Sequence, residues 1–330
     1  PAAGDPPYRG MERFDTEDAP LFFGREALTA ELAAFLRDHR FLAVVGASGS
    51  GKSSVVRAGL VPALQKTKAL PHNVLLPDGC ERWPVHLMTP KAHPLQELAT
   101  TLTRDSGSAL AQLRLAEELA ADARVLAAHV SRLLSGTAAE RLLLVVDQFE
   151  ELFTLCKDQR ERKAFVDNLL AAAVENGQTT VVLTLRADFY HNCFAFDNLR
   201  LALRNYQIPI GPMNRDELRR AIEGPAGAGG WQLEPGLVEQ LLLDVGNEPG
   251  ALPLLSHALL ETWTRRRGRL LTLAGYVAAG RVQGAIAQTA EQTFMQELTE
   301  EQQAIAKHIF LSLTELGESA EDTRRRAQLI

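Results

Sequence analysis

The sequence predicts an α/β fold in which a parallel sheet is covered by helices on both faces. Three short runs suit buried parallel strands: two are fully apolar, at 41–45 and 142–146, and the third, at 179–185, is rich in β-branched residues. Helical patterns alternate with these runs, as a parallel sheet requires. After residue 213 the strand signal largely vanishes and helical patterns dominate, so we expect a helical region to follow the sheet.

The bulk composition describes an ordinary globular protein of two or three domains, with 330 residues and 46% hydrophobic content. The net charge of −6 argues against a general attraction to nucleic acid or anionic lipid. No apolar run is long enough to cross a bilayer, so we expect no membrane contact. The scattered cysteines Cys80, Cys156 and Cys193 fit a reducing, cytoplasmic setting, in which each is a buried apolar residue.

The first part of the chain is expected to contain one strand between helices. Residues 1–20 are rich in Pro, Gly and acids and indicate a linker. Apolar residues at helical spacing predict a helix over 25–38, before the strand at 41–45. Pro62 should kink or end the helix that follows this strand. Residues 82–88 suggest a short strand that Pro84 places near a sheet edge.

The remaining elements follow in order. A helical pattern covers 95–134, with a break near 105–107 and a stop at Gly136. The strands at 142–146 and 179–185 flank a helix over 160–175, and 206–210 is a weaker strand because it contains Pro209. Further helices are expected at 214–226, 234–245, 251–267, 281–297 and from residue 300 onward.

Residues Gly46 to Ser53 read G-A-S-G-S-G-K-S, which fits the phosphate-binding pattern G-x-x-x-x-G-K-[ST] between a strand and a helix. Glycines let successive backbone N–H groups surround an anion, and the helix directs its positive end at the same point. Lys52 can reach the outer phosphates, and the Ser53 hydroxyl can ligate Mg²⁺. The expected cofactor-binding residues of this loop are Gly46, Ser48, Gly49, Ser50, Gly51, Lys52, Ser53 and Ser54. Because no N-K-x-D sequence is present, ATP or ADP is favoured over a guanine nucleotide.

The strand at 142–146 ends in Asp147, the form of a Walker B segment, and Asp147 is expected to hold Mg²⁺ through its water shell. Hydrolysis needs a carboxylate that orients or deprotonates water. Glu150 is the first candidate for this role and Glu151 the second. The alternative for both acids is that they are solvated charges at a helix end.

Arg186 ends the strand at 179–185, and the carboxyl ends of parallel strands are where α/β sheets bind ligands. We therefore expect Arg186 to detect the γ-phosphate through charge-assisted hydrogen bonds. The alternative is a surface ion pair with Asp188.

Five motifs follow one another along the chain: F-F-G-R-E at 22–26, the phosphate loop, D-Q-F-E-E-L-F at 147–153, T-L-R-A-D-F-Y at 184–190 and P-G-A-L-P-L-L-S-H-A-L at 249–259. Together they resemble the STAND-type signal-transduction P-loop NTPases, in particular the bacterial branch often fused to WD-type repeats. The resemblance implies a nucleotide-binding domain at 21–212, a helical lid at 213–280 and an incomplete winged-helix domain at 281–330. It also implies sensor and effector domains elsewhere in the full-length protein.

The resemblance also implies roles for single residues. Gly24 and Arg25 match the motif that passes the base and ribose, and Pro253 resembles the lid proline that packs on the base, although Ala251 stands where a glycine is usual. Asp147, Glu150 and Glu151 resemble the D-G-h-D-E form of the related NACHT group. Gln148 replaces the glycine of that form, and Glu150 replaces its second aspartate. Arg186 matches the arginine sensor.

The function implied is a switch that holds ADP in a closed state and, after a signal, exchanges it for ATP, opens and forms a homo-oligomer, with slow hydrolysis as the reset. Three alternatives stay open. The first is a continuously cycling AAA+-like ATPase, in which Arg200 or Arg204 would serve as an arginine finger supplied across a ring of subunits. A small-molecule kinase would need an acceptor, whereas the acids after Asp147 suit water activation. A winged-helix DNA-binding regulator conflicts with the net charge, and the basic run 265–269 is more simply a helix end.

Overall fold

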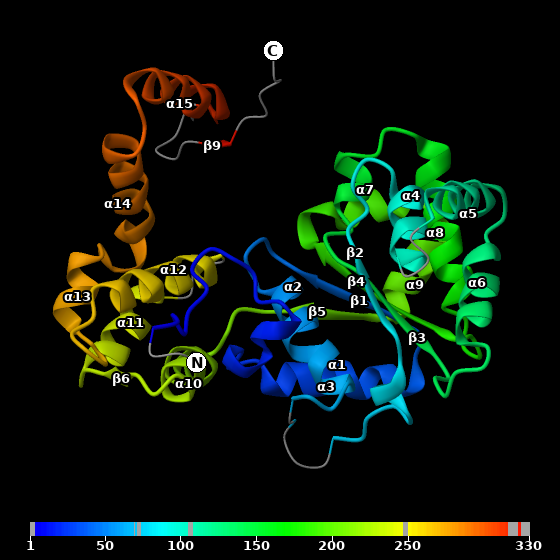
Figure 1. Ribbon diagram of the computed structural model, residues 1–330, viewed down its shortest axis with the longest axis horizontal. Helices are drawn as coiled ribbons and strands as arrows, with labels where there is room; N and C mark the ends of the chain where they lie inside the picture. The colour runs from blue at the N-terminus through cyan, green and yellow to red at the C-terminus, as the bar shows by residue number, and fades with distance from the viewer. Residues whose placement is uncertain are drawn as a thin grey trace.

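A computed structural model describes residues 4–68, 70, 74–104, 108–246, 250–315 and 323–324 (Figure 1). The helix break expected near 105–107 lies outside these residues. Within them, no helix is long and apolar enough to cross a membrane. The three cysteines are buried and unpaired, and burial raises the pKa of the Cys193 thiol to about 12.

The central feature is a five-stranded parallel sheet with the order β2-β3-β4-β1-β5, which confirms the predicted α/β fold. The strands are β1 (Phe41–Gly46), β2 (Val85–Met88), β3 (Leu142–Val146), β4 (Thr179–Arg186) and β5 (Gln207–Ile210). The two strands with a proline in or just before them, β2 and β5, are the edges, where a missing N–H costs least. The register pairs Gly46 with Arg186 and Val146 with Leu183, so the loops after β1, β3 and β4 lie together at the carboxyl-terminal ends of the strands.

Successive strand residues point to opposite faces of the sheet, and each face has its own helices. On one face, Leu142, Leu144 and Val146 pack with α4 (Pro94–Leu102), α5 (Ala109–Ala121), α6 (Val125–Leu134), α8 (Gln159–Ala172) and α9 (Asp197–Asn205). On the other, Leu143 and Val145 pack with α1 (Glu26–Asp38) and the helix after the phosphate loop. Short elements complete this part: η3 (Cys80–Arg82), α7 (Glu151–Thr154) and η5 (Ala187–Ala195). The helices expected at 25–38 and 160–175 are therefore present.

The helix after the phosphate loop changes its winding before Pro62. It consists of α2 (Lys52–Ser54), the π-helical η2 (Val55–Leu60) and α3 (Val61–Leu64). Proline has no N–H for the carbonyl four residues earlier, that of Ala58. The Lys68 Nζ donates to this carbonyl instead, at 3.4 Å. The expected effect of Pro62 thus takes the form of a wide turn before it, and the helix ends two residues after it.

A helical part follows the sheet: α10 (Arg215–Ala228), α11 (Leu237–Val245), α12 (Ala251–Thr264), α13 (Leu273–Ala278), α14 (Arg281–Gln296) and α15 (Glu300–Leu313). Figure 1 shows α10–α13 gathered to one side of the sheet, with α14 and α15 extending from them. Two further strand pairs were not expected from the sequence: the parallel pair β6 (Gln232–Leu233) and β7 (Leu270–Leu271), and the antiparallel pair β8 (Thr314–Glu315) and β9 (Thr323–Arg324). These strands have two residues each, too short for a periodic signal.

The basic run after α12 is engaged with the helix end. The Arg265 Nη1 donates to the Glu261 carbonyl at 3.0 Å, and the Arg266 guanidinium lies 3.8 Å from the centre of the Trp263 ring. Gly268, with a φ of 59°, does not cap α12, because the helix cap is Arg265 and Gly268 lies in the tight turn between Arg267 and Leu270. These contacts agree with a helix end rather than with a free basic patch.

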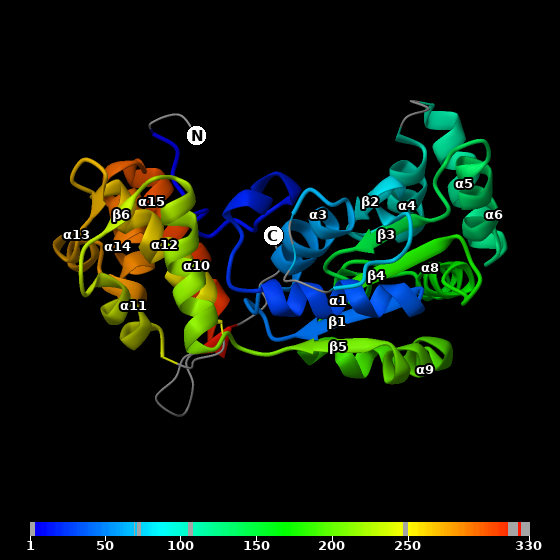
Figure 2. The ribbon, with the colours of Figure 1, turned by 90° about the horizontal axis from the view of Figure 1, so that it is seen from below.

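The N-terminal segment, residues 8–21, connects the two parts of the molecule (Figure 2). Tyr8 is 3% exposed and its hydroxyl donates to the Ile222 carbonyl of α10 at 2.8 Å. The 3-10 helix η1 (Thr16–Leu21) contacts both η2 and α10. The residues from 4 to 20, which composition led us to expect as a linker, are therefore packed along the sheet part and the helical part.

Candidate functional site

The phosphate-type loop between β1 and α2 has the backbone shape that its glycines predict. Gly49 and Gly51 have φ values of 72° and 87°, a region that disfavours other residues. The Lys52 Nζ lies inside the loop, where it donates to the carbonyls of Gly46 at 3.0 Å and Ala47 at 2.7 Å. Burial lowers the pKa of Lys52, which indicates an ammonium group that lacks full solvation and would gain from an anion.

The Walker B aspartate lies against the loop helix. Asp147 is fully buried, and its Oδ1 accepts from the Ser53 Oγ at 2.6 Å and from the Thr184 Oγ1 at 2.7 Å. The sheet order explains this arrangement, because β4 lies between β1 and β3 and brings Thr184 to both. Sequence reasoning missed Thr184, although a hydroxyl near the end of an apolar strand was the available signal.

The second oxygen of Asp147 is held by a residue that sequence reasoning also missed. The Arg57 Nε donates to Oδ2 of Asp147 at 2.9 Å, and the Arg57 Nη1 lies 2.9 Å from Oδ2 of Asp15. Arg13 lies further away, with its Nη1 at 3.6 Å from the same Asp147 oxygen. The available signal was spacing, because Arg57 follows Ser53 by four residues and so shares its side of the helix.

The donor set fits Mg²⁺. A serine hydroxyl and a carboxylate lie together at the loop, and Mg²⁺ keeps most of its waters and uses few protein ligands. No cluster of three or more His, Cys, Asp or Glu side chains with metal-binding geometry occurs among the described residues.

The two acids after Asp147 lie differently. The Glu150 Oε2 accepts from the backbone N–H of Arg186 at 3.3 Å, and Glu150 lines the cavity beside the loop. Burial raises the pKa of Glu150, and this effect exceeds the lowering of the pKa by the nearby positive charges of Lys52 and Arg186. Glu151 begins α7 and is not among the residues that line the cavity, although burial raises its pKa as well. The structure thus brings Glu150, rather than Glu151, to the site.

Arg186 lines the same cavity at the end of β4. Its side chain pairs with Asp188 through two contacts, Nε–Oδ1 at 3.1 Å and Nη2–Oδ2 at 2.7 Å. The ion pair weighed as the alternative for Arg186 is therefore present, at the cavity wall.

The turn that carries these groups has an unusual residue at its start. Gln148 has a φ of 54°, in the left-handed region that glycine adopts most readily. Its N–H donates to the Thr184 Oγ1 at 2.9 Å and to Oδ1 of Asp147 at 3.1 Å. A left-handed backbone at this position explains why the D-G-h-D-E pattern has glycine there, and Gln148 adopts this left-handed conformation.

Gly24 and Arg25 join the site to α10. Gly24 has a φ of 87°, and a Cβ there would lie 2.4 Å from the Glu217 carbonyl oxygen. The Arg25 Nη2 donates to the Gly211 carbonyl at 2.7 Å, and its Nη1 lies 3.6 Å from Oε2 of Glu217. Because Arg25 also lines the cavity, this motif contacts the cavity and the helical part at once.

The start of α12 lies on the phosphate loop. A Cβ at Gly49 would lie 3.2 Å from the Gly250 Cα and 3.3 Å from the Pro253 Cγ. Pro253 lines the cavity next to Ser48. The remaining loop serines face other partners: the Ser50 Oγ is buried without a hydrogen bond, and the Ser54 Oγ accepts from the Phe14 N–H at 3.3 Å.

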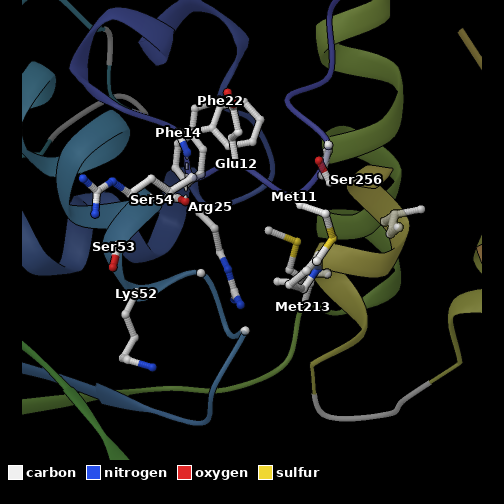
Figure 3. Close-up of a pocket in the computed structure, with 18 of the residues that line it drawn as sticks. Met11, Glu12, Phe14, Phe22, Arg25, Lys52, Ser53, Ser54, Met213 and Ser256 are labelled. Carbon is white, nitrogen blue, oxygen red and sulfur yellow. Dashed lines mark hydrogen bonds between the residues drawn. The ribbon is translucent and has the colours of Figure 1, made fainter. Parts of the chain in front are cut away.

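These residues enclose a cavity of about 330 Å³, a size typical of small-ligand sites. Figure 3 shows Lys52 and Ser53 at one end, and Phe14, Phe22, Met11 and Met213 toward the other, with Arg25 between. The walls come from the loop, the N-terminal segment, the Phe22 region and α12. One end is therefore suited to phosphates and the other to a flat, apolar group.

A parallel sheet with this loop after β1 and a buried aspartate after β3 defines a P-loop NTPase. The chain belongs to the novel STAND NTPase 1 family, whose model matches residues 7–330. Its fold is similar to that of a Walker-type ATPase of Pyrococcus abyssi, with 16% identity, a TM-score of 0.53 and coverage of 92% of this chain and 82% of that one. It is also similar to the Aeropyrum pernix ORC1 protein in complex with DNA, with 19% identity, a TM-score of 0.53 and coverage of 90% and 73%. A comparison with curated proteins gave no match.

Proposed function

We propose that this NTPase is an ATP/ADP-dependent regulatory switch whose helical part acts as a lid over the nucleotide. The observation that carries the proposal is the position of the start of α12, where Gly250 and Pro253 lie against Gly49 of the phosphate loop. The cavity has walls from both parts of the molecule. A nucleotide bound there would contact both parts, so its binding and release would be coupled to their relative arrangement.

The residues of the cavity suit separate tasks. Lys52 would exchange its loop carbonyls for phosphate oxygens, and Ser53 with Asp147 would hold Mg²⁺. When bound, Mg²⁺ supplies positive charge to the β- and γ-phosphates. Glu150 would orient the attacking water, since it faces the cavity from the adjacent strand edge. Arg25 and Pro253, which line the cavity, would contact the base and ribose, and Gly24 would hold the motif against α10.

Arg186 supplies a physical basis for distinguishing ATP from ADP. Its partner Asp188 is 54% exposed, and an exposed ion pair contributes only about 0–1 kcal/mol. A γ-phosphate in a partly closed cavity offers a stronger charge-assisted bond. We therefore expect ATP to draw Arg186 away from Asp188, whereas ADP leaves this pair intact.

The proposed cycle extends beyond the cavity. Residues 213–280 would form the lid and residues 281–330 part of a winged-helix domain, which together hold the ADP state closed. A signal received by other domains would permit exchange for ATP, opening and assembly into a homo-oligomer. A near-complete change between the two states requires a difference of about 5 kcal/mol in nucleotide binding. Hydrolysis would be slow, because its role is to reset the switch.

The test is to denature the purified protein and identify the nucleotide that it releases by ion-exchange chromatography. Near-stoichiometric ADP is the expected result, because a closed lid retains its product. Protein that is free of nucleotide and exchanges added ADP within seconds would contradict the closed state. Rapid, oligomer-dependent turnover would instead support a cycling ATPase.

A further inference from the structure

Arg57 lies between two carboxylates from distant parts of the chain. Its Nε donates to Oδ2 of Asp147, and its Nη1 pairs with Oδ2 of Asp15, both at 2.9 Å. Arg57 is 7% exposed and Asp147 is fully buried. A buried carboxylate is stable only when it is paired, so Arg57 is the main counter-charge of this group.

Two polar residues of the loop helix, Ser53 and Arg57, bind the same aspartate. Ser53 and Arg57 are four residues apart, and they bind different oxygens of Asp147. Arg57 lies in the π-helical segment η2, a kind of turn often found at functional sites. The carboxylate is therefore fixed from both sides, with Oδ1 facing Ser53 and Thr184.

The same guanidinium connects this aspartate to the N-terminal segment. Asp15 caps η1 by accepting from the Thr16 N–H at 2.8 Å, so its carboxylate has a fixed place. The segment is in turn anchored on α10 by Tyr8. A series of contacts thus runs from the helical part, along residues 8–15, to the metal position.

We propose that Arg57 is a positioning residue of the Mg²⁺ site, which holds the Asp147 carboxylate in its metal-binding orientation and is itself held by Asp15. The inference rests on the proposed function, because it requires that Mg²⁺ and a nucleotide bind at Ser53 and Asp147. Lysine could not replace Arg57, because an ammonium group lacks the planar fork that serves two carboxylates at once.

The experiment measures nucleotide and metal binding separately. A fluorescent ADP analogue is titrated into wild type, Arg57→Lys and Asp15→Asn with Mg²⁺ or with EDTA, and the Mn²⁺ affinity of the ADP-bound proteins is measured by electron paramagnetic resonance. We expect Arg57→Lys to weaken Mn²⁺ binding about 10-fold, the usual effect of losing a partner of a metal ligand. The affinity of this variant for the ADP analogue in EDTA should stay within about twofold of the wild-type affinity, because the nucleotide contacts remain.

The second variant tests the link to the N-terminal segment. Asp15→Asn should fold normally, because the Asp15 side chain is 44% exposed. It should cause a smaller loss of Mn²⁺ affinity, and the double variant should be no weaker than Arg57→Lys alone, since Asp15 acts through Arg57. Arg219→Lys is the matched control, because Arg219 also pairs with two carboxylates, Glu223 and Glu239, but does not line the cavity.

Two results would overturn the inference. One is an equal loss of ADP affinity in Mg²⁺ and EDTA, which would show a general structural effect. The other is an additive effect of Asp15→Asn in the double variant. Failure of the nucleotide site gives a different result, because the wild type itself would then bind no nucleotide under either condition. Failure of the switch alone would appear in the nucleotide-release test and would leave these titrations unchanged.

Discussion

Substitution of Gly24 by alanine tests the contact between the F-F-G-R-E motif and the helical part. A Cβ at residue 24 would lie 2.4 Å from the Glu217 carbonyl oxygen and 3.2 Å from the Ala221 Cβ. The carbonyl oxygen belongs to the backbone of α10 and cannot rotate away. The backbone of Gly24, at a φ of 87°, also disfavours alanine. Either α10 moves from the motif or the motif changes its conformation.

Two costs add in this variant. A left-handed conformation costs a non-glycine residue about 1–2 kcal/mol. Forcing a methyl group into a packed contact costs about 1–3 kcal/mol. We therefore expect Gly24→Ala to lower the free energy of unfolding by about 2–5 kcal/mol. This is a large share of the about 5–15 kcal/mol that stabilises a typical domain.

The assay is urea unfolding followed by circular dichroism, together with the release rate of a fluorescent ADP analogue. Gly227→Ala is the control, because Gly227 lies on α10 and a Cβ there meets nothing within 4 Å. The control should be stabilised by about 0.5–1 kcal/mol, since alanine is the better helix former. Gly24→Ala should also release the analogue faster than wild type. Equal stability of the two variants would refute the steric reasoning.

Three further substitutions address the cavity. Lys52→Ala should abolish nucleotide binding without unfolding the chain, because the Lys52 Nζ donates to carbonyls of its own loop, those of Gly46 and Ala47. Titration calorimetry and circular dichroism measure the two effects. Glu150→Gln should keep ADP binding but lose hydrolysis. Because burial raises the pKa of Glu150, wild-type hydrolysis should fall as the pH drops through a value above the ordinary 4.5. Gln148→Gly should raise the free energy of unfolding by about 0.5–1 kcal/mol, since relief of left-handed strain exceeds the entropy cost of glycine.

Each of these predictions has an outcome that contradicts it. Unchanged nucleotide affinity in Lys52→Ala would refute the assignment of the loop. Full hydrolysis in Glu150→Gln would return the role to Glu151 or to another residue. A destabilised Gln148→Gly variant would show that the exposed glutamine side chain stabilises the turn.

The strands were predictable because their signal is local. Fully apolar runs such as 142–146 suit burial, and Pro84 correctly indicated an edge strand. Pro209 only weakened the prediction of a strand at 206–210, and that strand is the other edge. The order of the strands was not predictable in the same way, because it depends on pairing between distant segments. The packing of residues 8–15 was missed for a related reason: Tyr8 and Asp15 find their partners, Ile222 and Arg57, far along the chain.

The site residues also differ in whether they could be predicted, according to whether they belong to a local motif. Loop glycines, Lys52, Ser53 and Asp147 follow from a compact motif whose residue types the chemistry requires. Thr184 and Arg57 reach Asp147 only after β4 has entered the sheet next to β3 and the loop helix has widened at η2. The pairing of Arg186 with Asp188 was one of two alternatives that spacing alone left open.

The position of β1 in the sheet has a consequence for synthesis on the ribosome. Its hydrogen-bonded neighbours are β4 and β5, and roughly 130 residues separate the end of β1 from the start of β4. The pair β2–β3 can form while β1 still has no partner. The strand that carries the phosphate loop therefore emerges first and is completed last, so a nascent chain stalled before Thr179 would expose the apolar residues of β1 and should be a preferred target of chaperones.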